Sequence, residues 1–247
     1  MPKQIGLIKL KGSLEGYSLY SSKDGFILRR QAGISGKRIR KDPAFSRFRE
    51  NGREFGRAAK GGKLIRNAFG KLIHLVVRGR VASRLNKVLL EVIHMDREGS
   101  RGERQLLDEH LGALNGFAFN ASAAFSDLFY APYEVGTRDN VLHVHIPTFE
   151  PGGGLRQVAG ATHYRLLAGC ASFDFVHGAR EGAQKMSQWL ALEGLPPAAI
   201  DLVFERGYRS GFPSLLVMGI QFGQEVNGEI CPLNNEKAHA LDVVGVV

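Results

Sequence analysis

The sequence predicts an α+β protein with an N-terminal β-hairpin, a basic helical segment and a C-terminal antiparallel β-domain of sandwich or jelly-roll type. Three observations predict this class. Asp24-Gly25 and Asn227-Gly228 each stand in a strand-like region, a pattern typical of tight hairpin turns. Apolar residues from position 45 to 95 recur at helical spacing. After Gly116, short strand-like runs are separated by Gly and Pro, without intervening helices. The expected divisions are therefore residues 1–32, 33–115 and 116–247.

The N-terminal division is expected to consist of short strands over residues 5–31. Residues 17–22 alternate, and Asp24-Gly25 turns the chain into the apolar run 26–28. The apolar stretch 5–10, together with the C-terminal stretch 243–247, would offer strand edges to another subunit.

The sequence predicts a helix start at residues 42–43, because Asp42 can cap a helix that has Pro43 at its first position. Its glycines each cost about 1 kcal/mol relative to Ala. This cost predicts either a break near Gly61-Gly62 or close packing against another backbone. A second amphipathic helix is expected over residues 81–95, and Ser100-x-x-Glu103 could cap a third over 103–114. The stripe expected to be buried along the first helix is Phe45, Phe48, Gly52, Phe55, Ala59, Gly62, Ile65, Phe69, Leu72 and Val76.

The β-domain should contain several short strands, and Asn227-Gly228 is the strongest hairpin signal in the chain. The segment 182–199 fits neither a helix nor a strand clearly. The expected strands are 141–146, 164–168, 171–176, 202–205, 214–222 and 239–246.

Charge is distributed unevenly along the chain. Between Arg29 and Lys87 there are 18 Lys and Arg residues against three acids, whereas the net charge of the whole chain is +9. The net charge is +16 up to Arg104 and −7 beyond it. Such asymmetry indicates a partner that is nucleic acid, an anionic surface or another copy of the chain. It says little about the fold.

The basic block has three interpretations. It could be a solvated cationic face, or it could bind the phosphates of nucleic acid through a ridge of regularly spaced cations. It could also pair with the acidic part of another copy, a head-to-tail contact that builds rings, tubes or filaments. The ridge consists of Arg47, Arg49, Arg53, Arg57, Lys60, Lys63 and Arg66.

One possible metal site can be read from the sequence. His143-x-His145, followed by Glu150, has the spacing of the first metal motif of cupins, with His163 further on. Residues i and i+2 of a strand share a face, so both imidazoles could reach one ion. However, the cupin glycine is out of register and no second motif follows, so two exposed strand histidines explain the pattern better. No cofactor motif and no catalytic constellation are found, and we expect a non-catalytic protein.

The location of the chain and the state of its cysteines can also be anticipated. The first residues have no long apolar region, so no secretory signal is expected and synthesis should be cytoplasmic. The longest uncharged run, 111–126, is too short and polar to span a bilayer. Cys170 and Cys231 are expected to be buried free thiols rather than a disulfide.

Three runs of the sequence resemble a family of bacterial proteins known mostly as hypothetical. The similarity covers nearly the whole chain, and DPAF…REN…EFG is its most distinctive part. No activity or site is attached to that family. The leading hypothesis from the sequence is a structural protein that assembles into a homo-oligomer or polymer, followed by a nucleic-acid-associated protein and then a metal-dependent cupin-like enzyme. The runs are KGSLEGYSLYSSKDGFILRRQAGIS (11–35), DPAFSRFRENGREFGRAAKGGKLIRNAF (42–69) and LLVMGIQFGQEVNGEICPLNN (215–235).

Overall fold

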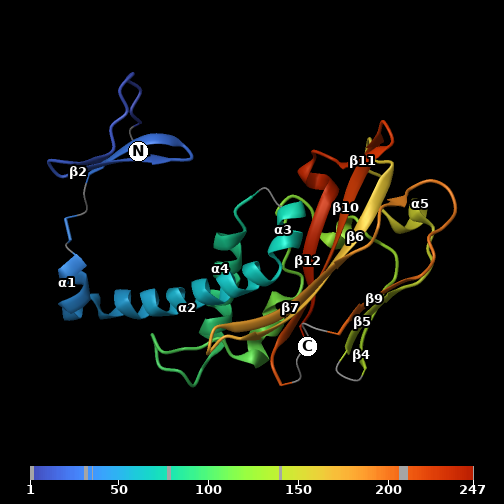
Figure 1. Ribbon diagram of the computed structural model, residues 1–247. Coiled ribbons are helices and arrows are strands. Elements are labelled where there is room, and N and C mark those ends of the chain that lie inside the picture. Colours follow the sequence, from blue (N-terminus) through green and yellow to red (C-terminus); the bar gives the residue numbers. More distant parts are fainter. Residues whose placement is uncertain are drawn as a thin grey trace. The chain divides into compact units, whose positions relative to one another are not determined.

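The computed structural model describes residues 3–30, 33–34, 36–76, 79–138, 141–205 and 211–246. The chain divides into two compact units, Met1–Glu50 and Asn51–Val247 (Figure 1). The division falls inside a helix, within the segment 33–115 that the sequence predicts as one helical region. Among the described residues, no helix is long and apolar enough to cross a membrane.

The first unit contains a small antiparallel sheet in the order β1 (Gly12–Leu14), β2 (Tyr17–Ser22) and β3 (Gly25–Arg30). The predicted hairpin is confirmed, since Ser22 pairs with Gly25, whose φ of 107° suits glycine. Residues 5–10 form a loop, so the strand predicted there is wrong. The polar residues before Asp42 contain a short helix, α1 (Gly36–Lys41), while predictions for residues 31, 32 and 35 lie outside the described part.

Three longer helices follow. A 3-10 turn, Pro43–Phe45, leads directly into α2 (Ser46–Ala68), and the predicted cap is confirmed because the Asp42 carboxylate accepts the Ala44 N–H at 3.0 Å. Next come α3 (Gly70–Val76) and α4 (Val81–Met95), which has the predicted bounds.

The buried face of α2 differs from the predicted stripe in its first half. Phe48 and Phe55 are 62% and 53% exposed, whereas Glu54 is buried. The prediction failed because it weighted the phenylalanines as core residues, although this half of the helix packs against a polar loop (residues 96–105). The buried residues of α2 are Glu54, Ala58, Gly61, Gly62, Ile65 and Ala68.

Gly61 and Gly62 allow the close approach that the sequence offered as one alternative. A Cβ at Gly61 would lie 2.6 Å from Leu106 Cδ1, and one at Gly62 would collide with the Asn86 side chain. The helix continues through both glycines and is interrupted later, between Ala68 and Gly70. Close packing, rather than a break, therefore explains this pair, although the neighbours are side chains and not the other backbone that the sequence predicts.

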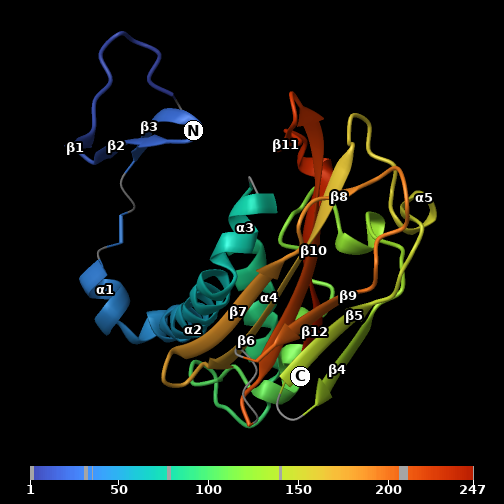
Figure 2. The same ribbon diagram turned by 45° about the vertical axis from the view of Figure 1, so that its right-hand side comes forward.

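The second unit is built on a six-stranded antiparallel sheet that curls into a half-barrel (Figure 2). Long strands β10 and β6 pair at its centre. Strand β6 merges the predicted runs 164–168 and 171–176, and β10 extends the predicted run 214–222 to the Asn227-Gly228 turn. The Asn227-Gly228 hairpin is confirmed by the pairing of Val226 with Glu229. The strands are β6 (His163–Asp174), β7 (Ala179–Met186), β8 (Leu190–Ala191), β10 (Ser214–Val226), β11 (Glu229–Pro232) and β12 (His239–Val246).

Each face of this sheet has its own core. One face packs against α2, α3 and α4 around Phe69, Leu89 and Val217. The other packs against a smaller sheet with the order β4 (Glu134–Arg138), β5 (Val141–Ile146) and β9 (Ile200–Phe204). Helices and antiparallel sheets are therefore both present as predicted, whereas the sandwich or jelly-roll form is not confirmed.

Short helical turns complete the second unit. They are α5 (Pro151–Gly154) and the 3-10 turns η2 (Asp108–Leu114), η3 (Phe125–Asp127) and η4 (Glu236–Ala238). The helix predicted over 103–114 is thus shorter and of another type. Ser100 and Glu103 form a tight turn, with the Glu103 N–H donating to the Ser100 carbonyl at 2.8 Å. The Glu103 carboxylate instead forms ion pairs with arginines of α2.

Candidate functional site

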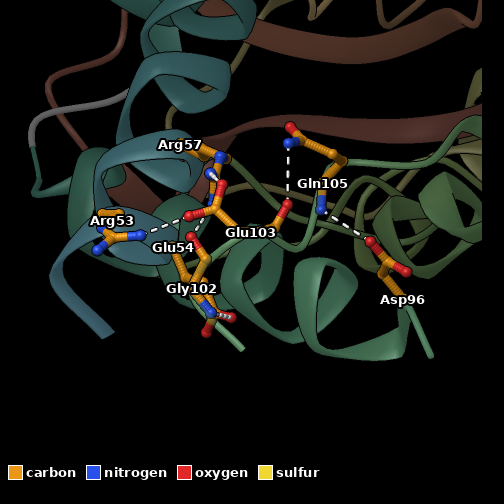
Figure 3. Close-up of polar contacts among 7 residues, drawn as sticks. All are labelled: Arg53, Glu54, Arg57, Asp96, Gly102, Glu103 and Gln105. Atoms are coloured by element: carbon orange, nitrogen blue, oxygen red, sulfur yellow. Dashed lines mark hydrogen bonds and ion pairs between the residues drawn. The ribbon is translucent and has the colours of Figure 1, made fainter. Parts of the chain in front are cut away.

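The polar side of α2 holds the loop 96–105 that follows α4 (Figure 3). Arg53 and Arg57 both pair with the carboxylate of Glu103, the latter at 3.2 Å. The Arg57 guanidinium also donates to the Gly102 carbonyl at 2.8 Å. Arg53 and Arg57, one helical turn apart, therefore both form ion pairs with Glu103, which lies about fifty positions further along the chain.

Asp96 organises the same loop from its other end. Its carboxylate accepts backbone N–H groups from Glu98, Gly99 and Gln105 at 3.1, 2.7 and 2.9 Å. These bonds, with that of Gly99 the strongest, hold the pKa of Asp96 below its usual value because they favour the ionised form. The loop is consequently pinned at both ends by charge-assisted hydrogen bonds.

Glu54 follows Arg53 on α2 and is buried. One carboxylate oxygen accepts the Gly102 N–H at 2.8 Å, and the other lies 3.3 Å from His94 Nε2. A buried carboxylate is costly unless it is paired and hydrogen-bonded. Both oxygens of Glu54 are occupied in this way, which suits a structural role better than proton transfer.

A cavity of about 470 Å³ opens beside Glu54. Its wall combines the Glu54–His94 pair with two arginines and an apolar side, and Arg104 Nε is buried without a hydrogen-bond partner among the described residues. No Ser, Thr or Cys lines it, so the described wall offers no hydroxyl or thiol nucleophile. The lining residues are Asn51, Glu54, Phe55, Leu90, His94, Arg101 and Arg104.

The basic ridge predicted along α2 is largely engaged within the chain. Besides Arg53 and Arg57, Arg49 donates to the carbonyls of Ile39 and Asp42 at 2.8 Å, and Arg66 donates to that of Gly62 at 3.1 Å. The three remaining cations are exposed and have no hydrogen bond or ion pair with any part of the chain that is described. They are Arg47, Lys60 and Lys63.

The four metal candidates do not come together. His143 and His145 share the less buried face of β5, but His145 Nδ1 lies 2.6 Å from Asp201 Oδ1. Glu150 precedes the first turn of α5, and His163 Nδ1 lies 2.9 Å from Thr162 Oγ1. Over the described ranges, no three His, Cys, Asp or Glu residues are grouped so that they could hold a metal ion.

Neither cysteine forms a disulfide, as the sequence predicts, but only Cys170 is buried. Burial raises the pKa of the Cys170 thiol to about 12, which keeps it protonated and unreactive. Cys231 is exposed on β11, so the expectation that both thiols are buried is wrong.

Sequence reasoning missed the anchoring acids Glu54, Asp96 and Glu103. Only Glu54 left a local signal, because it stands one turn before Ala58 on the true buried face of α2. The partners of Glu54 and Glu103 are about forty to fifty residues away in the sequence, where local patterns carry no information.

Comparison with protein-family models, with curated proteins and with solved structures finds no match. The resemblance to hypothetical bacterial proteins therefore stays a prediction.

Proposed function

We propose that this chain is a non-catalytic structural protein that assembles with copies of itself into a homo-oligomer or polymer such as a filament, tube or shell. The observation that carries the proposal is the lack of a core in the first unit. Among its described residues, Ile27 is the one buried hydrophobic side chain, while Ile5, Leu7 and Ile8 are 92%, 105% and 79% exposed.

A sheet of this size is at best marginally stable unless a hydrophobic face is covered. Burying a Leu or Ile side chain stabilises by about 1.5–3 kcal/mol. Covering the three apolar residues of the loop at 5–10 would therefore supply stability that the unit lacks by itself. Large exposed apolar side chains gathered in one short loop are typical of protein interaction sites.

The charge division supports a contact between unlike surfaces. The part up to Arg104 carries +16 and the remainder −7, so one region of a copy complements another region of the next. Contacts between unlike patches are head-to-tail, and they close into rings or continue as filaments.

Strand addition at the chain ends, the route suggested by the sequence, receives no support. Residues 5–10 are a loop, and the outer edge of β12 is already bonded to residues 116–119. The Gly116 N–H donates to the Val243 carbonyl, and the Phe119 N–H to the Leu241 carbonyl, each at 2.8 Å. The outer edge of β7 carries Arg180, Glu181 and Lys185, charges typical of edges protected against pairing.

The assembly proposal predicts that the purified chain elutes far above its 27.1 kDa mass at low salt. Raising the ionic strength to about 1 M shortens the Debye length to about 3 Å, which should weaken contacts between exposed charges. Light scattering at micromolar concentration measures the mass of the assembly at low salt and its decrease at high salt. A monomer at both low and high salt would contradict the proposal.

Nucleic-acid binding is the second candidate, and the exposed cations Arg47, Lys60 and Lys63 of α2 are the observation in its favour. Four of the seven predicted ridge residues already have acceptors within the chain, which leaves a short ridge. The third hypothesis, a metal-dependent cupin-like enzyme, has no comparable support.

A further inference from the structure

A large groove of the second unit lies at the end of α4. Its volume is about 1130 Å³, and its wall comes from α4, the loop after it, the start of η2 and the turn between β6 and β7. Solvent-exposed apolar side chains line the groove, since Met95 is 44% and Val176 84% exposed. The groove therefore presents uncovered apolar surface.

Acidic side chains surround that apolar surface. Glu98, Asp108 and Glu109 line the groove, and Arg97 is the one cation among the lining residues apart from two histidines. His94 and His110 are paired with Glu54 and Glu109, respectively.

Asp108 has no hydrogen bond or ion pair with any described residue. Partial burial raises its pKa, and the nearby charge of Asp174 raises it further. Asp174 itself is paired with His177 at 2.8 Å. The groove thus carries negative charge that the described part of the chain leaves uncompensated.

The loop at residues 5–10 of the first unit has the complementary chemistry. Gln4 closes it, because its side chain accepts the Leu10 N–H at 2.9 Å and donates to the Leu10 carbonyl at 3.1 Å. The closed loop displays Ile5, Leu7 and Ile8. The lysines within and beside it are Lys3, Lys9 and Lys11.

We propose that the acidic groove at the end of α4 receives the N-terminal loop, residues 5–10, of a second copy of the chain. Apolar side chains then meet Met95 and Val176, while the lysines face Glu98, Asp108 and Glu109. The proposal rests on the assembly proposed above and names its contact. It is favoured over a membrane partner for the loop because the same chain contains a groove that matches the loop in both apolar character and charge.

The contact is tested with two full-length variants that each disable one side. Leu7→Arg alters the loop and leaves the groove intact, whereas Val176→Arg alters the groove and leaves the loop intact. Both side chains are highly exposed, so the fold should tolerate either change. Each variant alone should assemble at least about tenfold more weakly than the wild type. Leu195→Arg, at a position that is 93% exposed and outside both surfaces, is the matched control.

Mixing the two variants is decisive. The intact loop of Val176→Arg can occupy the intact groove of Leu7→Arg, and neither copy can extend the chain further. An equimolar mixture should therefore form a 1:1 heterodimer by light scattering. Two results would overturn this contact if the wild type assembles. One is that the single variants assemble as well as the wild type, and the other is that their mixture stays monomeric. Either result would leave the assembly proposal standing. A monomeric wild type would overturn both.

A membrane role for the loop gives a different result. In that case Leu7→Arg would leave assembly unchanged and abolish binding of the protein to vesicles of phosphatidylserine and phosphatidylcholine. That outcome would also overturn the groove contact.

Discussion

Asp242 is a buried carboxyl group on β12 with an unusual balance of partners. Its Oδ2 accepts the Phe125 N–H at 2.7 Å, whereas Oδ1 has no partner in the described chain. Burial raises the pKa of Asp242 to about 6. The Phe125 hydrogen bond opposes this shift, the charge of Asp127 adds to it, and Arg84 opposes it. The same carboxylate adds to the effect of burial in raising the pKa of Tyr133.

This raised pKa predicts that Asp242 destabilises the fold at neutral pH. Between pH 4 and 6 the folded chain holds a proton that the unfolded chain has lost, so the free energy of unfolding falls as pH rises through this window. Asp242→Asn keeps the acceptor for Phe125 and removes the charge. It should therefore stabilise by about 1–3 kcal/mol above pH 6 and have little effect near pH 4.

Urea denaturation at several pH values measures this difference. Glu193→Gln, an exposed substitution after β8, is the control and should show no such trend. A stability difference for Asp242→Asn that does not grow between pH 4 and 6 would show that the carboxyl titrates normally.

At the scale of elements, α2 contains two kinds of glycine. A Cβ at Gly52 or Gly56 would meet nothing within 4 Å, whereas one at Gly61 would lie 2.6 Å from Leu106 Cδ1. Gly56→Ala should therefore stabilise by about 0.5–1 kcal/mol, the difference in helix propensity. Gly61→Ala gains the same propensity but overpacks the contact with Leu106, at a cost of about 1–3 kcal/mol, so its free energy of unfolding should be lower than that of Gly56→Ala.

Chemical denaturation of the two variants provides the comparison, and each serves as the control for the other. Equal effects at positions 56 and 61 would mean that packing against Leu106 does not constrain the helix. If Gly56 instead lies in an interface between copies, Gly56→Ala should weaken assembly while leaving α2 intact.

The elements that could be predicted from sequence are those that are determined by neighbouring residues in the chain. Asn227-Gly228 has φ values of 53° and 83°, which few other residue pairs adopt, and the amphipathic pattern of α4 is uniform along its length. Strand β7 was not recognised because its residues are mostly exposed, so no apolar face marks it. Residues 5–10 resembled a strand by composition, but the side chain of Gln4 closes them into a loop.

The candidate sites were less accessible to sequence reasoning because they depend on distant contacts. The cavity beside Glu54 joins α2, α4 and the loop 96–105, and the acidic groove adds the turn that contains Val176. Charge asymmetry indicated that surfaces of opposite sign exist. It could not indicate that Arg53 and Arg57 already share one carboxylate, that of Glu103.

For the whole molecule, these internal contacts leave three exposed cations of α2 without a hydrogen bond or ion pair in the described chain. They are Arg47, Lys60 and Lys63. If each contacted one phosphate of duplex DNA, log K would fall with log salt at a slope of about −2.7 from this helix. Replacing all three with Ala should then remove that part of the slope, at about one unit per contact. Gel retardation between about 50 and 200 mM salt measures the slope of log K against log salt for each protein.

The control replaces three exposed cations of the second unit outside α2, Arg156, Arg180 and Lys237, with Ala. The net charge changes equally in the two triple variants. An equal loss of binding in both would therefore indicate general electrostatic attraction rather than a ridge. If neither single-stranded nor double-stranded DNA or RNA is retarded at about 50 mM salt, nucleic acid is excluded as the partner of α2. The three cations would then be left to face solvent or the acidic surface of another copy.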